Sequence, residues 1–350
     1  MSARIYLDHA ATTPLLPEAR AAMATGLEMW ANPSSPHREG RAARAALEEA
    51  RGRIKAALGW SHELIFTSGA SEAAAIALKG RRVAVSAVEH QSVLGAAPGA
   101  VVLPVEALGR VVGDPVPGAL LAIQQVNSET GVIQPLEAIA PATREATCPL
   151  FADCAQGAGK LALPDADLIA VSAHKLGGPP GIGALLARDL GLLTATGQGQ
   201  EQGYRPGTEN LPAALGFAAA LEALAARGDW TAPLVAWRAE LDAVIRAGGG
   251  EVIADRADRL ATIASYRMPG TSAAAQLMRF DGQGFAVSAG SACSSGSMKP
   301  SHVLAAMGIG EGEAGEVIRV SFGHSTTHDE VARFAEAWTG LARGARARAA

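Results

Sequence analysis

Short apolar runs alternate with helical patterns from about residue 60 to residue 190. This alternation is typical of a mostly parallel sheet with helices on both faces, because strands buried on both sides read as nearly continuous hydrophobic segments. The sequence therefore predicts an α/β fold whose central sheet is mostly parallel and seven-stranded. The expected strands are Leu64–Phe66, Val83–Val85, Val101–Leu103, Leu120–Val126, Leu150–Ala152, Leu168–Val171 and Ala184–Ala187.

A different pattern follows the glycine-rich stretch from Gly197 to Gly207. Long Ala- and Leu-rich segments predict two helices, and shorter strand-like and helix-like segments come after them. The shorter strand-like and helix-like segments predict a smaller α+β domain. The helices are expected at 211–227, 230–247, 272–280 and 328–342, and the strands at 260–268 and 316–322.

The composition narrows the class of protein. The chain has 350 residues, of which 49% are hydrophobic, and a formal net charge of -4. Its basic residues are spread out apart from three arginines near the C-terminus, so nucleic acid is not expected as the main partner. The sequence has no pattern of a secretion signal and no apolar run long enough to span a bilayer, so we expect no membrane association and a cytoplasmic location. Three cysteines are too few for a disulfide framework or a zinc site, and no metal is expected.

Polar clusters follow several of the expected strands, where ligands of parallel sheets gather. The segment Thr67-Ser68-Gly69-Ala70-Ser71-Glu72 passes from a strand through a tight turn into a helix. Backbone N–H groups and the positive end of the helix dipole then converge on one point, which suits a phosphate. The alternative is an ordinary serine N-cap at the start of a helix.

Asp153 ends another expected strand, among apolar residues where an unpaired carboxylate is unfavourable. A protonated pyridine nitrogen would satisfy it, and Gln156 could donate to a phenolic oxygen on the same ring. A helix-capping aspartate is the alternative. His90 follows the strand that begins at Val83 and could stack on a ring and move protons, or it could be structural.

Lys175 stands at the end of an apolar run and is followed within two residues by Gly177-Gly178-Pro179. Burial there would lower the pKa of the amine and free it to attack a carbonyl. A lysine that simply ends a strand beside a glycine turn is the alternative. Together, a phosphate cradle, a carboxylate for a ring nitrogen and a desolvated lysine describe a site that holds pyridoxal phosphate as a Schiff base.

Two further residues carry chemistry. Cys293 lies within Ser288 to Ser297, a run of small residues that predicts a mobile loop, and its thiol could travel to a substrate and back. The other cysteines, Cys148 and Cys154, have apolar surroundings and are expected to be buried. Arg319 interrupts a β-branched run and needs an anion, which is either a substrate carboxylate or a buried Asp or Glu.

These motifs resemble those of cysteine desulfurases, similar to the NifS and IscS proteins, in the pyridoxal-phosphate-dependent class V aminotransferase family. The resemblance covers nearly the whole chain and includes Tyr6–Pro14, Asn32–Ser35, Ser68–Glu72, Val126–Gly131, Asp153 with Gln156, Ser172–Lys175, Arg205–Thr208, Ser291–Cys293 and Ile318–Arg319. It implies fold type I, with a large cofactor-binding domain over residues 15–228. Residues 1–14 and 229–350 would form the small α+β domain, which carries the mobile cysteine loop at 288–297.

The resemblance also implies roles for individual residues. Lys175 would carry the Schiff base, His90 would stack on the cofactor and assist proton transfer, and Cys293 would be the catalytic thiol. The substrate carboxylate would bind to Asn127 and Arg319. The residues implied in cofactor binding are Ala70, Ser71, Asn127, Asp153, Gln156, Ser172, His174 and Lys175, with Thr208 reaching the phosphate of the partner subunit in a homodimer.

The activity implied by the resemblance is removal of sulfur from L-cysteine, which gives L-alanine and a persulfide on Cys293. An acceptor protein would receive this sulfur for iron–sulfur cluster, thio-cofactor or tRNA biosynthesis. The chain ends soon after the last expected helix, without the tail that housekeeping members use to bind their scaffold, so an iron–sulfur scaffold and a tRNA-thiolation protein both stay open as acceptor. The alternatives are another class V enzyme (an aminotransferase, a selenocysteine lyase or a C–S lyase) and a non-catalytic sulfur-relay or scaffold protein.

Overall fold

The central sheet of the computed structural model has seven strands, as the sequence predicts, and their order is β2-β8-β7-β6-β5-β3-β4. The model describes residues 4–197, 199–290 and 300–349. Strand β8 is antiparallel to both of its neighbours, β2 and β7, and the other neighbouring pairs are parallel. The strands are β2 (Glu63–Thr67), β3 (Val83–Ser86), β4 (Val101–Leu103), β5 (Leu120–Ala122), β6 (Leu150–Asp153), β7 (Leu168–Ser172) and β8 (Gly183–Ala187).

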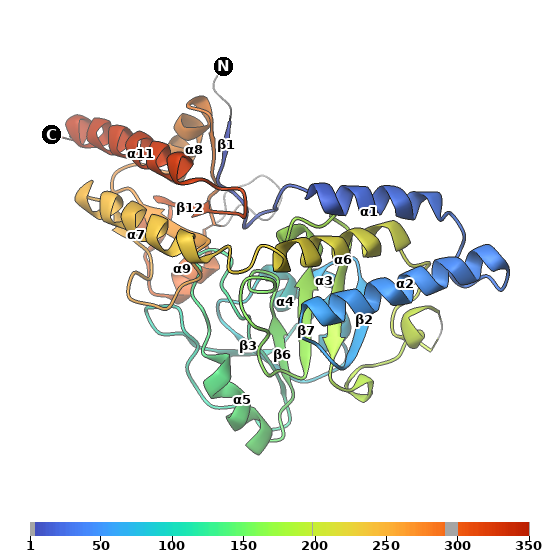
Figure 1. Ribbon diagram of the computed structural model, residues 1–350. Coiled ribbons are helices and arrows are strands. Elements are labelled where there is room, and N and C mark those ends of the chain that lie inside the picture. Colours follow the sequence, from blue (N-terminus) through green and yellow to red (C-terminus); the bar gives the residue numbers. More distant parts are fainter. Residues whose placement is uncertain (1–3, 198, 291–299, 350) are drawn as a thin grey trace.

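Helices cover both faces of this sheet (Figure 1). Successive strand residues point to opposite faces, so Leu64 and Phe66 join one hydrophobic cluster and Ile65 joins another. The first cluster includes residues of α1 (Pro17–Glu28), α2 (Arg38–Ala57), α5 (Leu136–Glu145) and α6 (Leu211–Ala225). The second is completed by α3 (Ala70–Leu78) and α4 (Gln91–Ala96). Burial on both faces explains the continuous apolar strands of the sequence.

Several elements differ in length from the prediction. The strand expected over Leu120–Val126 is β5 only as far as Ala122, although Ile123 N still donates to Phe151 O and Gln125 N to Asp153 O of β6. Gln124 N instead donates to the carboxyl of Glu89, and Asn127 N donates to Val132 O. The final helix, expected over 328–342, continues as α11 (His328–Ala349).

The rest of the chain forms two small sheets with helices around them. Strands β12, β10 and β9 make an antiparallel sheet, and β1 pairs in parallel with β11. The bounds are β1 (Ile5–Tyr6), α7 (Ala232–Ala247), β9 (Glu251–Val252), β10 (Ile263–Arg267), α8 (Ala273–Gly282), β11 (Phe285–Ala286), α9 (His302–Ala306), α10 (Glu311–Ala314) and β12 (Val317–Ser321). Three short 3₁₀ turns, at Ala173–Lys175, Leu190–Leu192 and Glu201–Gly203, complete the described elements.

The main hydrophobic cluster of the small sheets is separate from the two clusters on the faces of the large sheet. Ile5 and Leu7 pack with residues of α7, α8 and α11, and the aromatic side chains Phe280, Phe334 and Trp338 are buried there. A further cluster joins both parts, with Val88 and Val132 from the large-sheet region against Val303 and Met307. These clusters support a division into 15–228 against 1–14 and 229–350, whose boundaries stay a prediction.

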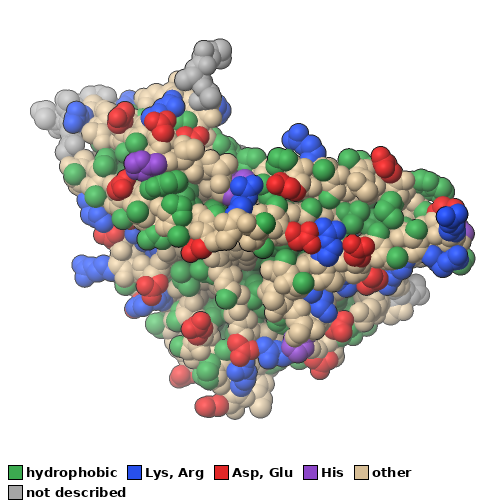
Figure 2. All heavy atoms as spheres, in the orientation of Figure 1, with side chains coloured by type: hydrophobic (Ala, Val, Ile, Leu, Met, Phe, Trp, Pro, Cys, Tyr) green, Lys and Arg blue, Asp and Glu red, His purple; other side chains and the backbone are tan. Residues whose placement is uncertain are grey.

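Figure 2 shows the charge on one face of the molecule. Lys and Arg side chains are interspersed there with Asp and Glu over most elements. Within the described ranges, no helix combines the length and the apolar composition needed to cross a bilayer.

Candidate active site

A cavity of about 260 Å³ lies at the carboxyl ends of the parallel strands. This is where open α/β sheets bind ligands, because the connections diverge there and leave a crevice. The cavity brings together most of the residues that the sequence singles out. It is lined by Ala10, Ala11, Ala70, Ser71, His90, Ser92, Gln124, Val126, Ser128, Asp153, Ala155, Gln156, Ser172, His174, Lys175 and Arg319.

Lys175 reaches the cavity from the 3₁₀ turn Ala173–Lys175, which directly follows β7. Its Nζ donates to the carbonyl oxygen of Ala10 at 2.5 Å and to that of Ala11 at 2.8 Å. The turn continues through Gly177, whose φ of 77° is a left-handed conformation that suits glycine. The half-buried amine is thus held at the rim of the sheet by main-chain acceptors from the N-terminal segment.

Asp153 is the last residue of β6, and its side chain faces the same cavity while the residue is 8% exposed. Its Oδ1 accepts from the N–H of Ala155 at 2.9 Å. Burial raises the pKa of this carboxyl, whereas the Ala155 hydrogen bond and the charges of His90 and Lys175 lower it. No described helix begins here, so the carboxylate closes a local turn and is not the helix cap of the alternative; it also offers its charge to a cation in the cavity.

Gln156 is buried beside Asp153, and one of its two amide atoms has no hydrogen-bond partner among the described residues. Its Nε2 donates to the carbonyl oxygen of Ala10 at 2.9 Å. Its Oε1 is buried and has no hydrogen-bond partner among the residues that the structure describes. A buried acceptor without a partner is unfavourable, so a ligand hydroxyl at this point would be stabilised.

The turn between β2 and α3 presents the start of a helix to the cavity. Gly69 occupies the N-cap position, and no described side chain caps α3. The alternative of a serine N-cap is therefore wrong. Ser68 instead donates its backbone N–H to the carboxylate of Glu72, which also accepts from Arg205 Nε at 3.0 Å. The uncapped first turn of α3 leaves backbone donors for an anion.

Strand β8 crosses closely behind this turn. A Cβ on Gly183 would lie 2.4 Å from the carbonyl oxygen of Val171 and 2.7 Å from Cα of Gly69. Glycine is needed at this position because both contacts are backbone. Ser172 and His174 border the same region, and His174 Nδ1 lies 3.2 Å from Thr12 Oγ1. Burial, followed by the charge of Lys175, lowers the pKa of His174 to about 4, so the ring is neutral near pH 7.

His90 combines a structural contact with a place in the cavity. Its Nδ1 accepts from Ser92 N at 3.2 Å at the start of α4 and lies 2.7 Å from Ser92 Oγ. The preceding Glu89 is fully buried, and burial raises the pKa of its carboxyl well above the ordinary value. The Oε2 of Glu89 has no hydrogen-bond partner in the described part of the chain.

Arg319 comes from β12, across the cavity from the large sheet, and is 2% exposed. Its Nη2 donates to Asp8 Oδ1 at 2.8 Å and its Nη1 donates to the carbonyl oxygen of Ser128 at 3.0 Å. An aspartate partner is therefore present, although Asp8 is only partly buried and not the buried carboxylate of the alternative. The guanidinium still borders the cavity, and its Nε finds no partner in the residues described.

Two residues singled out by the sequence are not among those that line the cavity, and a third lies outside the described residues. The amide of Asn127 is engaged inside its own loop, where Oδ1 accepts from the N–H groups of Glu129 and Thr130, each at 2.9 Å. Its Nδ2 donates to Val88 O at 3.1 Å. Thr208 is exposed in the segment that precedes α6. Cys293 lies outside the described residues, while Cys148 and Cys154 are buried and free, as expected.

Comparisons with known proteins identify the family. The class V aminotransferase profile matches residues 5–334. The chain belongs to the class V aminotransferase family. It is 36% identical to a cysteine desulfurase of Cereibacter sphaeroides, over 95% of this chain and 94% of the relative. Among solved structures, a NifS-like protein from Rickettsia africae superposes with a TM-score of 0.87 and 29% identity, over 97% and 99% of the two chains. A structure described as SspA in complex with cysteine superposes with a TM-score of 0.78 and 29% identity, over 92% of this chain and 100% of that chain.

Membership of the class V aminotransferase family implies pyridoxal phosphate, and the cavity fits this group. Gln156 Oε1 is a buried acceptor without a partner among the described residues, and Asp153 supplies a buried carboxylate for a ring nitrogen. The first turn of α3 leaves backbone N–H donors where a phosphate would lie, and Gly183 leaves the space beside that turn. The described residues contain no cluster of His, Cys, Asp and Glu that could hold a metal ion.

Sequence reasoning missed residues at the site and next to it. Lys160 donates from Nζ to the carbonyl oxygen of Gln156 at 2.9 Å. Burial, followed by the charge of Lys175, lowers the pKa of Lys160 to about 7. One signal was available, because lysine is scarce in this chain and Lys160 follows Asp153 and Gln156 closely. The main-chain acceptors Ala10 and Ala11 gave no such signal, since any residue carries a carbonyl group.

Proposed function

We propose that this chain is a pyridoxal-phosphate-dependent cysteine desulfurase, which takes sulfur from L-cysteine and leaves L-alanine. The observation that carries the proposal is the convergence of Lys175, Asp153 and the unpartnered amide oxygen of Gln156 on one cavity at the strand ends. A relative named cysteine desulfurase that matches 95% of the chain supports it. The structure of SspA with cysteine supports cysteine as the substrate.

The residues of the cavity have distinct places around the cofactor. Lys175 is the amine for its aldehyde, Asp153 is the carboxylate for its ring nitrogen, and Gln156 contacts its phenolic oxygen. Bound in this way, pyridoxal phosphate withdraws electrons from the Cα of the substrate. The first turn of α3, with Ala70 and Ser71, holds the phosphate together with Ser172 and His174.

Other residues bind the substrate and move protons. The guanidinium of Arg319 pairs with the substrate carboxylate, for which its planar fork is suited. His90 would stack on the cofactor and assist proton transfer at the reacting carbon, and Lys175 Nζ would exchange protons with the same centre. Asn127 is proposed as a further contact of cofactor and substrate; its engaged amide would have to exchange partners to make it.

Cys293 is proposed as the acceptor of the sulfur. Its thiolate attacks the sulfur of the substrate, an S–S bond forms, and the Cβ–S bond of the substrate breaks. The bonding pair stays on the carbon, which takes up a proton and becomes the methyl group of alanine. Cys293 keeps the sulfur as a persulfide for transfer to an acceptor protein of iron–sulfur cluster, thio-cofactor or tRNA biosynthesis. The proposal also includes a homodimer, in which Thr208 reaches the phosphate of the partner subunit, and a cytoplasmic location.

The replacement Cys293→Ala tests this function. Purified wild-type protein loaded with pyridoxal phosphate is expected to form equal amounts of alanine and sulfide from L-cysteine and a reducing thiol. The Cys293→Ala variant is expected to lose this turnover while keeping the visible absorbance of the bound cofactor. Cys148→Ala is the matched control, because it removes a thiol that is buried away from the cavity.

Two results would contradict the proposal. Turnover of cysteine that persists in Cys293→Ala would favour another class V activity, such as an aminotransferase, a selenocysteine lyase or a C–S lyase. A wild-type protein that stays colourless with the cofactor and inert toward cysteine would favour a non-catalytic sulfur-relay or scaffold role.

A further inference from the structure

Glu72 places a negative charge on the turn that is proposed to hold the phosphate. It is the third residue of α3, and its carboxylate accepts from the backbone N–H of Ser68, just before the Gly69 N-cap. Burial raises the pKa of this carboxyl, but the hydrogen bonds from Ser68 and Arg205 together bring it below its ordinary value, so the group is ionised near pH 7. A carboxylate in the first turn of a helix uses the same positive dipole end that a phosphate would use. Glu72 would therefore repel the phosphate unless its charge is compensated.

Arg205 supplies this compensation. Its Nε donates to Glu72 Oε1 at 3.0 Å, and the two side chains are partly buried, at 22% and 30% exposed. Neither residue is among those that line the cavity of Lys175, whereas Ala70 and Ser71 of the same turn are. The arginine therefore acts on the turn through Glu72.

The side chains that border the turn inside the cavity supply no positive charge of their own. Ser71 and Ser172 are neutral. Burial, followed by the charge of Lys175, lowers the pKa of His174 to about 4, so its ring is neutral near pH 7 as well. In the proposed function Lys175 is joined to the aldehyde of the cofactor and not to its phosphate. An uncompensated charge on Glu72 would therefore act on the phosphate with little opposition.

The segment that carries Arg205 is fixed along β2, the edge strand that leads into the turn. Glu201 is 4% exposed, and its Oε2 accepts from Phe66 N and from Arg51 Nη1, each at 2.8 Å. Its Oε1 accepts from Arg51 Nη2 at 2.9 Å, and Arg51 also donates to the carbonyl oxygen of Leu64 at 2.6 Å. This buried ion pair holds the chain beside β2, so the guanidinium four residues later is delivered to the turn.

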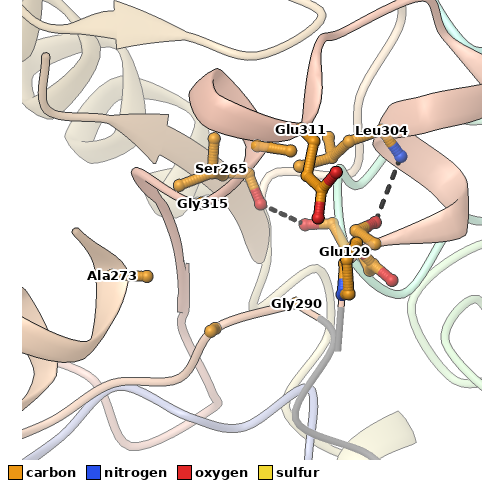
Figure 3. Close-up of a pocket in the computed structure, with 12 residues that line it drawn as sticks. Glu129, Ser265, Ala273, Gly290, Leu304, Glu311 and Gly315 are labelled. Atoms are coloured by element: carbon orange, nitrogen blue, oxygen red, sulfur yellow. Dashed lines mark hydrogen bonds between the residues drawn. The ribbon is translucent and has the colours of Figure 1, made fainter. Parts of the chain in front are cut away.

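Burial alone does not require a cation beside a carboxylate in this part of the fold. Glu129, in the loop between β5 and α5, is 7% exposed and lines a second cavity of about 250 Å³ (Figure 3). Its Oε2 accepts from the neutral hydroxyl of Ser301 at 2.6 Å. Glu72 is more exposed and yet pairs with an arginine, which is the arrangement expected where a second anion binds close by.

We propose that Arg205 is a positioning residue for the phosphate of the cofactor, because it neutralises Glu72 on the turn that receives this group. Glu72 closes the turn through Ser68, and Arg205 removes the repulsion that this carboxylate would otherwise exert. The first turn of α3 can then accept a phosphate although it contains an acidic side chain. This inference rests on the proposed function, in which the turn holds the phosphate of pyridoxal phosphate.

Replacement of Arg205 by methionine leaves the charge of Glu72 uncompensated. The cofactor-free protein is titrated with pyridoxal phosphate and with pyridoxal, which has the same ring and aldehyde but no phosphate. The affinity for pyridoxal phosphate is expected to fall about 3- to 30-fold, whereas that for pyridoxal should change less than about twofold, because only the phosphate experiences the added repulsion. The loss should shrink at about 1 M salt, which screens partly exposed charges.

Glu72→Gln separates the charge from the structure of the turn. Its amide oxygen can still accept from Ser68 N, while Arg205 now adds a positive charge. The affinity for pyridoxal phosphate should therefore stay or rise, and the double variant with Arg205→Met should return to within about threefold of the wild type. A fall in Glu72→Gln as large as in Arg205→Met would overturn the inference, because the pair would then act only on structure. No recovery in the double variant would also overturn it, because Arg205 would then bind the phosphate itself.

Arg53→Met is the matched control. Arg53 of α2 pairs with Glu222 of α6, with Nε 2.7 Å from Oε1, and neither residue lines the cavity. Both affinities should stay as in the wild type, and a selective loss for pyridoxal phosphate here would overturn the inference. If Arg205→Met does not fold, Arg205→Gln removes the charge and can still donate to Glu72, and the same loss is expected. Failure of the proposed function is distinguishable, since the wild type would then take up neither compound.

Discussion

Lys175 and Gln156 donate hydrogen bonds to the same acceptor, the carbonyl oxygen of Ala10. The N-terminal segment that provides this oxygen is itself fixed, since Ala10 N donates to Ser321 Oγ at 2.8 Å and Thr13 N donates to His174 O at 2.8 Å. The lysine and the glutamine therefore share one main-chain acceptor, and the lysine has a second one in Ala11 O. Covalent attachment of the amine to a cofactor would leave that oxygen to Gln156, which stays in place beside the ring.

Replacement of Lys175 by alanine tests the covalent attachment. We expect borohydride treatment of the loaded wild type to fix the mass of the cofactor on a peptide that contains Lys175. The Lys175→Ala variant should show no such adduct, and alanine formation should fall about 10²- to 10⁴-fold, because the amine also carries protons. Mass spectrometry and a turnover assay measure the two effects. An adduct found on Lys160 instead would contradict the assignment.

Replacement of Asp153 by asparagine tests the carboxylate for the ring nitrogen. The variant keeps the shape and the hydrogen bond from Ala155 but loses the charge, so kcat is expected to fall about 100-fold. Asp165→Asn is the matched control, because Asp165 lies before β7 at the other end of the sheet and pairs there with Arg144 and Arg188. Steady-state rates with L-cysteine decide the matter, and equal rates in both variants would be inconsistent with the role of Asp153.

The lowered pKa of Lys160 predicts a specific pH dependence of stability. Burial and the charge of Lys175 bring this pKa from 10.5 to about 7. Between these values the unfolded chain binds a proton that the folded chain does not, so the free energy of unfolding should rise with pH across this window. Below pH 7 both states are protonated and the destabilisation is complete.

The replacement Lys160→Met removes this contribution. Urea unfolding at pH 7, 8.5 and 10 should give a flatter dependence in this variant than in the wild type. Lys79→Met is the control, because Lys79 is exposed at the end of α3 and its loss should leave the slope unchanged. Parallel curves for the wild type and Lys160→Met would show that Lys160 is not desolvated.

Replacement of Gly183 by alanine tests the cradle behind the phosphate turn. A methyl group there meets the backbone of Val171 and Gly69, so β8 must move away from one of them. The affinity for pyridoxal phosphate is expected to fall at least about tenfold, the effect of about 1.4 kcal/mol. Gly52→Ala in α2 is the control, since nothing lies within 4 Å of its Cβ position, and it should raise stability by about 0.5–1 kcal/mol. Fluorescence titration with the cofactor measures the affinity, and an unchanged value for Gly183→Ala would exclude the steric argument.

The sequence alone was sufficient for the seven strands of the large sheet and for the polar residues at their ends. Buried parallel strands need continuous apolar side chains, and such apolar runs can be recognised locally in the sequence. The end of each apolar run also identifies the polar residue that follows the strand. Lys175, Asp153 and Gln156 were found in this way. The pattern predicted too long a strand at β5, since Ile123 is buried and still donates to Phe151 O of β6 while the pairing with β3 stops at Ala122.

Contacts between distant segments were decided only by the tertiary structure. Arg319 meets Asp8 across 311 positions, and Ser301 meets Glu129 across 172. The sequence showed that a buried arginine needs an anion, but it could not say which one, because many carboxylates satisfy the same charge. The carbonyl oxygens of Ala10 and Ala11 were equally hidden, since every residue has one. The amino-acid pattern determined which chemical groups this protein brings to the ends of its strands, because hydrophobic periodicity is local. Chain packing determined which of these groups face one another, because hydrogen-bond partners depend on the path of the whole chain.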